Sequence, residues 1–296
     1  MTVAVPIAED AAGAAFEVRR PQVLKTPLVF ASPHSGRVYP DDMMTASKLN
    51  ARDIRRSEDA LVDGLIAGGE AAGAALLLCR VGRAYVDVNR EPWELDPDMF
   101  SDRVPEHARA VTARVVAGLG SVPRVVGDGR AIYARKLRFA EAEARIEAVH
   151  APWHAALEGL MDEAHARFGA GVLIDWHSMP SAASRGEARK GRPKPDVVLG
   201  DRHGAACAPG LTALIKRELE RAGYVVALNS PYAGGYTTQA HGRPEDGRHA
   251  VQVELDRALY LDERTLEPRP GFERLKRDLD KLFATLAGAD WKKVLA

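Results

Sequence analysis

Short apolar runs that end in polar residues recur along the 296-residue chain. The clearest run begins at Val172 and leads directly into Asp175, His177 and Ser178. A short β-branched and aliphatic run that is bounded by glycine and proline is typical of a buried strand, and open α/β sheets bind ligands at the carboxyl ends of their strands. The pattern therefore predicts that His177 lies at a strand end, either as a core residue that caps the strand or as a group that binds metal or moves a proton.

The same pattern occurs earlier in the chain, where the apolar segment 27–31 leads into Ser-Pro-His-Ser-Gly with His34 at its centre. Proline and glycine end strands and bend the chain, so His34 is also expected at a strand end. A third histidine, His203, follows the predicted strand at 196–200, so this position alone does not establish a ligand. Further strands are predicted at 74–81, 83–90, 224–228 and 249–255.

Apolar residues at helical spacing predict helices between these strands. A helix over 57–66, with Ser57 as its N-cap, would carry Glu58 and Asp59 in its first turn, where they either complement the helix dipole or act as a metal ligand. Other helices are predicted at 133–168, 212–222 and 272–286. The first of these is either one helix or two that divide near Pro152. Strands that alternate with helices predict an α/β fold with a largely parallel sheet.

No repeat and no linker divides the chain, so we expect a single domain over residues 21–296 after a loose lead-in over residues 1–20. Residues 182–195 combine glycine and proline with basic side chains from Arg185 to Lys194. This composition indicates an exposed loop, whose positive charge is either solvated or attracts a bulky anionic substrate.

Composition narrows the classes of partner. Lysine plus arginine and aspartate plus glutamate number 41 each, so the formal net charge is zero, which gives no reason to expect nucleic acid or an anionic membrane as a partner. The two cysteines, Cys79 and Cys207, have neither the spacing of a disulfide framework nor that of a metal site. This cysteine usage favours a cytoplasmic protein. The absence of a recognisable secretory leader and of an apolar run long enough to span a bilayer points the same way.

The polar residues at the predicted strand ends suit metal-assisted chemistry. His34, His177 and one carboxylate would give zinc three protein ligands and leave a position for water. Zinc in such a site polarises a carbonyl and lowers the pKa of its bound water. Glu254 lies among apolar residues on a predicted strand, where desolvation raises the pKa of a carboxyl group toward that of a general base, although an edge strand with a wet polar face is the simpler explanation.

Two further sets of residues bear on the substrate and on alternative metal sites. Asn89 and Arg90 would bind a substrate carboxylate, although an arginine at a strand end is more often a surface ion-pair partner. His150 and His154 are four residues apart but lack the acidic residue that zinc-protease helices carry between their histidines. The favoured reaction is therefore metal-assisted hydrolysis of an amide in a small anionic molecule.

Several segments resemble the N-formylglutamate amidohydrolase family, in the same order along the chain. They are SPHSG, SEDALVDGL, RAYVDVNR, LIDWHSMPS, PYAGGYTT and VQVELDRALY. The resemblance implies a phosphorylase/hydrolase-like α/β fold with a mixed sheet, related to the zinc carboxypeptidases. It also implies a divalent metal and the hydrolysis of N-formyl-L-glutamate to formate and L-glutamate, the last step of one histidine-degradation route.

The resemblance implies roles for particular residues. His34 and His177 would be metal ligands, and Glu254 would be the general base. The first metal motif of the carboxypeptidases is His-x-x-Glu, whereas position 37 here is arginine, so the carboxylate ligand must come from elsewhere. Asp59 is favoured for this ligand, with its neighbour Glu58 as the alternative.

The remaining implied roles concern the substrate and the surroundings of the metal. Asn89 and Arg90 resemble the pair that binds the substrate carboxylate in zinc carboxypeptidases. Gly235 and Tyr236 of PYAGGYTT would shape the pocket, and Asp175 is a candidate partner for His177. Two alternatives stay open, namely hydrolysis of another N-acyl amino acid or peptide-like amide and a non-catalytic carboxylate-binding protein on the same fold.

Overall fold

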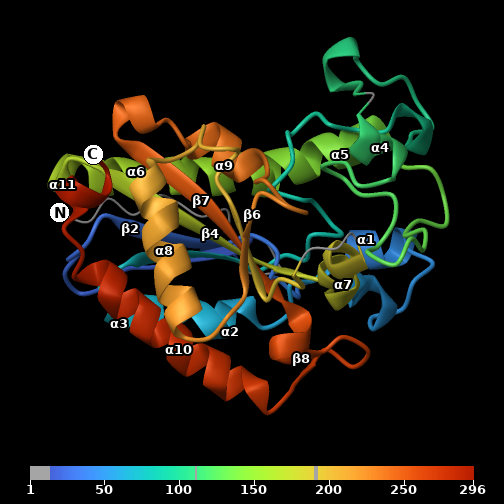
Figure 1. Cartoon of the computed structure of the whole chain (residues 1–296). Coiled ribbons are helices and arrows are strands. Elements are labelled where there is room, and N and C mark those ends of the chain that lie inside the picture. Colours follow the sequence, from blue (N-terminus) through green and yellow to red (C-terminus); the bar gives the residue numbers. More distant parts are fainter. Residues whose placement is uncertain (1–13, 111, 190–192) are drawn as a thin grey trace. The chain divides into compact units, whose positions relative to one another are not determined.

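A computed structural model, which describes residues 14–110, 112–189 and 193–296, gives the fold shown in Figure 1. The chain forms two compact units that interleave in sequence. Of the described residues, one unit contains 14–17, 36–58 and 79–155, and the other contains 18–35, 59–78 and 156–296. The predicted boundary between a lead-in and a single domain at residue 20 stays a prediction.

A seven-stranded sheet is the centre of the fold, with the strand order β1-β3-β2-β4-β7-β5-β6. The pairs β2/β3, β2/β4, β4/β7 and β5/β6 are parallel, whereas β5 and β7 are antiparallel. The predicted α/β class with a mixed, mostly parallel sheet is therefore confirmed. The strands are β1 (Phe16–Arg19), β2 (Leu28–Ser32), β3 (Ala75–Cys79), β4 (Gly171–Met179), β5 (Val197–Gly200), β6 (Val226–Leu228) and β7 (Arg248–Asp256), and a separate pair is β8 (Leu261–Asp262) with β9 (Glu267–Pro268).

The α-helices are mostly short, and two are long. They are α1 (Asp41–Ala46), α2 (Val62–Ile66), α3 (Gly68–Ala71), α4 (Ala113–Val116), α5 (Phe139–Arg145), α6 (Ala151–Phe168), α7 (Ser181–Arg189), α8 (Pro209–Arg221), α9 (Tyr236–His241), α10 (Gly271–Ala287) and α11 (Trp291–Val294). Short 3₁₀ helices are η1 (Asp53–Ser57), η2 (Pro97–Met99), η3 (Glu106–Ala108), η5 (Pro244–Asp246) and η6 (Arg257–Leu259), and η4 (Ile146–His150) is a π-helical segment.

The apolar core of the second unit lies on one face of the sheet. Side chains alternate between the two faces along a strand, and alternate residues of β4 and β7, such as Trp176 and Val253, join this core. Helices α2, α3, α8 and α10 cover the same face (Figure 1). The Phe30 ring lies 5.8 Å from that of Trp176 and 4.8 Å from that of Phe283 on α10, between ring centroids. These aromatic contacts pack α10 against the sheet.

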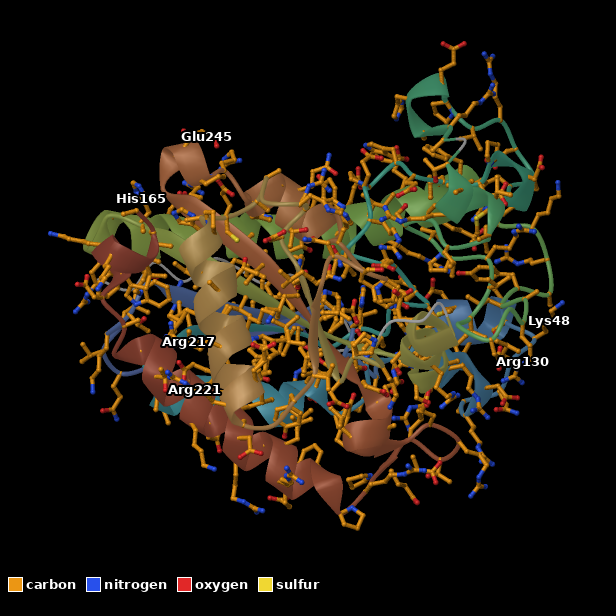
Figure 2. All side chains as sticks on the ribbon, viewed as in Figure 1. Lys48, Arg130, His165, Arg217, Arg221 and Glu245 are labelled. Carbon is orange, nitrogen blue, oxygen red and sulfur yellow. The ribbon has the colours of Figure 1, made fainter. Side chains whose placement is uncertain are left out.

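Helix α8 shows how the sequence orients an amphipathic helix on this core. Leu211 and Ile215 are fully buried against the sheet. Arg217 and Arg221 are 53% and 68% exposed and point into solvent (Figure 2). Apolar residues at helical spacing therefore determine which side of the helix packs.

The opposite face of β4 and β7 is polar. Asp175 and His177 alternate with the core residues of β4, and Gln252 and Glu254 do so on β7. The parallel register pairs Asp175 with Gln252 and His177 with Glu254. Since paired strands lie about 4.8 Å apart, the four side chains are direct neighbours.

The strand predicted over 83–90 is wrong, because this segment forms turns. Asp87 Oδ1 accepts the N–H of Asn89 at 2.9 Å, and the N–H of Arg90 bonds to the Asp87 carbonyl at 3.3 Å. An aspartate that bonds to the nearby backbone competes with strand pairing. Arg90 is therefore not at a strand end.

The helix predicted over 57–66 begins later than expected. Helix η1 ends at Ser57, Glu58 is extended, and α2 begins only at Val62. The Asp59 N–H bonds to the His34 carbonyl at 2.9 Å, which withdraws it from a helical hydrogen-bond pattern. The Ser57 hydroxyl accepts the Gly127 N–H at 3.0 Å instead of capping a helix. Glu58 and Asp59 thus lie outside the first turn of α2.

The structure of three other segments bears on the elements that the sequence predicts. Residues 181–189 form α7, so the predicted loop over 182–195 is wrong there, and residues 190–192 lie outside the described part of the chain. The end of the predicted lead-in forms β1, whereas residues 1–13 lie outside the described residues. Within 133–168 the chain is helical without a break from residue 139, and the π-helical segment η4 directly precedes α6, which contains Pro152. A proline has no N–H to donate, and the wider turn accommodates it.

Phe283→Ala should lower the free energy of unfolding by about 3–5 kcal/mol, because it leaves a cavity between α10 and the sheet. Urea denaturation followed by circular dichroism measures this loss. Val225→Ala, at a side chain 43% exposed, is the control and should change stability by less than about 0.5 kcal/mol. A loss below about 1 kcal/mol for Phe283→Ala would contradict the packing described.

Candidate metal centre

Three buried donor groups from distant parts of the sequence meet in the second unit: His34, Asp59 and His177. The Nδ1 atoms of the two histidines are 3.1 Å apart. Asp59 Oδ2 lies 3.2 Å from His177 Nδ1 and 3.4 Å from His34 Nδ1. These atoms define a compact triangle inside the protein.

The triangle has the dimensions of a zinc coordination face. Zinc binds imidazole nitrogen and carboxylate oxygen at about 2.0–2.1 Å in tetrahedral geometry, so neighbouring donors in a tetrahedral site lie about 3.3 Å apart. The separations of 3.1, 3.2 and 3.4 Å match this edge length. The donors fit a small divalent cation.

Local structure brings each donor to the cluster. His34 follows the end of β2, and the Ser32 hydroxyl bonds to that of Ser35 at 2.9 Å across the turn. The hydrogen bond from the Asp59 N–H to the His34 carbonyl holds these two residues side by side. His177 belongs to β4, which pairs with β2 in parallel.

Asp175 orients the imidazole of His177. Its Oδ2 lies 2.9 Å from His177 Nε2, and both residues lie on the polar face of β4. When the His177 ring is neutral, as a metal ligand must be, the Nε2–H donates to the carboxylate and Nδ1 presents its lone pair to the cluster, as in the carboxylate–histidine pairs of metal sites. Burial alone lowers the pKa of His177, but the carboxylates of Asp175 and Asp59 outweigh it and raise that pKa well above its usual value.

Arg257 holds Asp59 from the other side. Its guanidinium donates to Asp59 Oδ1 at 2.8 Å and to the Ser178 hydroxyl at 3.0 Å. Burial raises the pKa of Asp59, yet the hydrogen bonds from His177 and His34 and the charge of Arg257 hold it well below its usual range. Because Oδ1 is taken by Arg257, Oδ2 is the oxygen that faces the imidazoles.

The buried charges around the cluster also favour a dication. Asp59, Asp175 and Glu254 are three buried carboxylates, and Arg257 is one buried guanidinium. With both histidines neutral, as metal ligands must be, these formal charges leave an excess of two negative charges. Uncompensated charge in a protein interior is costly. A divalent ion between the three donors would neutralise this excess.

Glu254 lies beside the cluster on β7. It is paired in register with His177 and points to the same face of the sheet. Its Oε1 accepts a hydrogen bond from Gln252 Nε2 at 2.8 Å. A carboxylate next to three metal donors is the arrangement that hydrolysis by an activated water requires.

The model of the N-formylglutamate amidohydrolase family matches residues 26–261. The chain belongs to this family. Family membership makes it an amidohydrolase, which confirms the enzyme class predicted from the sequence over the alternative of a non-catalytic binding protein. The described part of the chain contains no helix both long and apolar enough to cross a membrane.

Individual relatives support this amidohydrolase assignment. An N-formylglutamate deformylase of Pseudomonas aeruginosa is 32% identical over 244 residues, which cover 81% of this chain and 84% of the relative. A protein of the same name from Pseudomonas putida is 28% identical over 242 residues, which cover 81% and 83%.

Solved structures support the fold. The crystal structure of N-formylglutamate amidohydrolase from Ralstonia eutropha JMP134 aligns with a TM-score of 0.85 and 37% identity, and covers 92% of this chain and 97% of that chain. A gene product of Agrobacterium tumefaciens aligns with a TM-score of 0.63 over 94% of this chain and 96% of its own, and at 19% identity it supports the fold alone.

Of the two adjacent acids that the resemblance to the amidohydrolases left as alternatives, Asp59 joins the histidines. Glu58 belongs to the other unit, where Arg55 binds both of its oxygens, each at 2.9 Å, and the Tyr39 hydroxyl donates to Oε1 at 2.9 Å. Burial and the negative charge of Glu58 raise the pKa of Tyr39. The Glu58 carboxylate is thus engaged in a structural ion pair.

Asn89 and Arg90 also belong to that other unit. Arg90 donates to the carbonyls of Leu119 at 3.2 Å and Asn89 at 2.9 Å. Burial lowers the pKa of Arg90, against the raising effect of Asp87. The role of Asn89 and Arg90 toward the substrate of the amidohydrolase stays a prediction.

The other histidines singled out from the sequence are accounted for by different contacts. His150 and His154 donate to the backbone carbonyls of Arg90 and Val88, each at 2.8 Å. His203 follows β5 in a turn and is exposed. Among the described residues, none of the three joins the donor cluster.

Gly235 and Tyr236 stand at the start of α9, which packs on β7 and β4. The Gly235 N–H donates to Gln252 Oε1 at 2.9 Å. The loop is thereby tied to the strand that carries Glu254. A pocket-shaping role for these two residues stays a prediction.

Arg257 was not identified from the sequence. It follows the predicted strand 249–255 within VQVELDRALY, a segment that carries the family resemblance. A basic residue directly after an apolar strand was the available signal. Its significance depends on Asp59, which is almost two hundred residues away in the chain, and this proximity arises only on folding.

The protein should bind one divalent ion per chain, and Asp59→Asn should reduce the bound metal to well below one ion, because a neutral amide is a poor ligand for zinc. Elemental analysis after gel filtration measures the stoichiometry. His203→Ala removes a histidine that also follows a strand but lies outside the cluster, and it should retain the ion. Full metal content in Asp59→Asn would show that the ion binds elsewhere.

Proposed function

We propose that the protein hydrolyses N-formyl-L-glutamate to formate and L-glutamate. The observation that carries this proposal is the convergence of His34, Asp59 and His177 beside Glu254 in a member of the amidohydrolase family. Relatives named N-formylglutamate deformylase support the choice of substrate. A small anionic N-acyl amino acid is also consistent with a chain of zero net charge, which needs only a local cationic site to bind it.

His34, Asp59 and His177 would hold the divalent ion, for which zinc is the candidate because two imidazoles and one carboxylate are typical zinc ligands in hydrolases. When bound, such an ion supplies Lewis acidity that polarises the formyl carbonyl and acidifies water. Asp175 holds the His177 ring in the tautomer that binds metal, and Arg257 holds the Asp59 carboxylate.

Glu254 acts as the general base. A water oxygen forms a bond to the formyl carbon while Glu254 takes a proton from that water. Glu254 then gives the proton to the glutamate nitrogen as the C–N bond breaks, and the products leave as formate and L-glutamate. The register between Glu254 and His177 supports this role, because it keeps the carboxylate next to the metal donors.

Substrate recognition is assigned to residues that the family resemblance suggests. Asn89 and Arg90 would bind a carboxylate of the substrate, and Gly235 and Tyr236 would shape its pocket. Arginine suits this task because its planar fork binds a carboxylate through two hydrogen bonds.

Release of formate from N-formyl-L-glutamate by the zinc-loaded protein is the direct test. The panel should include N-formyl-L-aspartate, N-formyl-L-methionine and N-acetyl-L-glutamate, which vary the side chain and the acyl group separately. We expect the highest kcat/KM for N-formyl-L-glutamate. A preference for another member would redirect the proposal to that substrate, and no turnover of any member by metal-loaded protein would refute it.

Glu254→Gln should lower kcat by about 10²–10⁴, because the amide cannot accept the proton from water. Its metal content should equal that of the wild type, since Glu254 is not among the three donors. Steady-state kinetics and elemental analysis on the same preparation separate the two effects. Retention of full activity would exclude Glu254 as the base.

Arg90→Gln should lower kcat/KM for N-formyl-L-glutamate by about 10² or more, because loss of one partner of a charged pair costs about 2–5 kcal/mol. Arg124→Gln is the control in the same unit, since Arg124 is 45% exposed and paired with Asp96. Kinetics with both variants measure the difference. Equal effects of the two substitutions would exclude a specific role for Arg90.

A further inference from the structure

Gln252 lies on β7 two residues before Glu254, so the two side chains point to the same face of the sheet. Its side chain is buried, with 4% of its surface exposed. The flanking residues Val251 and Val253 point into the core on the other face. A buried amide among polar neighbours requires partners for both its oxygen and its nitrogen.

The backbone of Gly235 determines which way the Gln252 amide faces. The Gly235 N–H can only donate, so the group that meets it at 2.9 Å must be the amide oxygen. The amide nitrogen then faces Glu254 and donates to Oε1 at 2.8 Å. In the flipped orientation the amide NH₂ of Gln252 would face the Gly235 N–H, donor against donor. The two hydrogen-bond partners therefore fix the orientation of the Gln252 amide.

Gly235 is itself held in place by α9. The Thr238 hydroxyl donates to the Gly235 carbonyl at 2.9 Å, and His241 at the end of the helix bonds to Glu158 on α6 at 3.0 Å. Gly234 adopts a φ of 117°, and a Cβ there would lie 2.5 Å from the Thr238 hydroxyl oxygen. The donor that sets the Gln252 amide thus belongs to a well-anchored turn.

We propose that Gln252 is a positioning residue, which holds the Glu254 carboxylate in the orientation needed for proton transfer. The terminal torsion of a glutamate has a broad energy profile, so a single hydrogen bond can select one orientation of the carboxylate plane. The Gln252 amide does this with a donor whose direction is set by Gly235. The inference rests on the proposed function, because it concerns the base of that reaction.

The first test compares Gln252→Glu with the wild type. This variant keeps an oxygen for the Gly235 N–H and nearly the same volume, but it replaces the donor that faces Glu254 with a second carboxylate oxygen. A hydrogen bond to a charged group contributes about 1.5–3 kcal/mol, so kcat should fall by about 10–100-fold. KM and metal content should stay close to those of the wild type. The melting temperature should fall, because a second buried carboxylate is costly, so kcat is measured at a temperature where circular dichroism shows the variant to be folded.

Gln239→Glu is the matched control. Gln239 lies on α9 with an exposed side chain, so the substitution adds the same charge near the loop without touching Glu254. It should leave kcat unchanged. A wild-type kcat in Gln252→Glu would overturn the inference. An equal fall in kcat in Gln239→Glu would overturn it too, as would a fall in Gln252→Glu that is fully explained by loss of metal or of folded protein.

The second test does not depend on turnover. The chain has three glutamines, and Gln22 and Gln239 are exposed whereas Gln252 is buried. Selective ¹⁵N labelling of glutamine side chains should give one slowly exchanging amide pair, which Glu254→Ala shifts and exposes to faster exchange. Three rapidly exchanging pairs, or a slow pair insensitive to Glu254→Ala, would overturn the inference even if the proposed substrate proved wrong.

Discussion

The in-register pairing of β4 with β7 is the constraint on which both the core and the candidate metal centre depend. It runs from Gly171 opposite Arg248 to Met179 opposite Asp256. Because side chains alternate along both strands, the register gives one face to the apolar core and the other to a row of polar groups. A shift by one residue would turn His177 into the core and leave Trp176 among the polar groups.

The electrostatics of the centre follow from this geometry. Two of the three donors have a second contact that directs them: Asp175 binds the far nitrogen of His177, and Arg257 binds the far oxygen of Asp59. Buried charged groups are tolerated when they are paired and hydrogen-bonded. The contacts that stabilise the buried carboxylates of Asp175 and Asp59 also orient His177 Nδ1 and Asp59 Oδ2 toward the centre of the donor cluster.

The sequence was informative where local rules decide structure. Apolar runs located the strands that end near His34 and His177, and their shared pattern suggested a common site. Turn chemistry at Asp87 overrode an apparent strand, since a side-chain acceptor satisfied backbone groups that a sheet would otherwise pair. The choice between Glu58 and Asp59 depended on a hydrogen bond from the Asp59 backbone to the His34 carbonyl, which no local pattern predicts.

Contacts between residues far apart in the chain were the part that the sequence could not reveal. The role of Arg257 depends on its ion pair with Asp59, and the role of Gln252 depends on its hydrogen bond from the Gly235 N–H. A basic or amide side chain on its own is compatible with many surroundings. Such partners became recognisable only when the register of the sheet and the position of α9 were known.

The ion pair between Arg257 and Asp59 also bears on which metals the proposed site would select. With Oδ1 occupied, Asp59 offers one oxygen beside two imidazole nitrogens. Calcium prefers six to eight oxygen ligands, and magnesium prefers an octahedron of oxygens, so abundant hard cations gain little from this site. Copper(II) generally binds nitrogen ligands more tightly than zinc does. Exclusion of copper from the proposed site would therefore depend on metal supply in the cell, whereas exclusion of magnesium and calcium would follow from the donor set of the site.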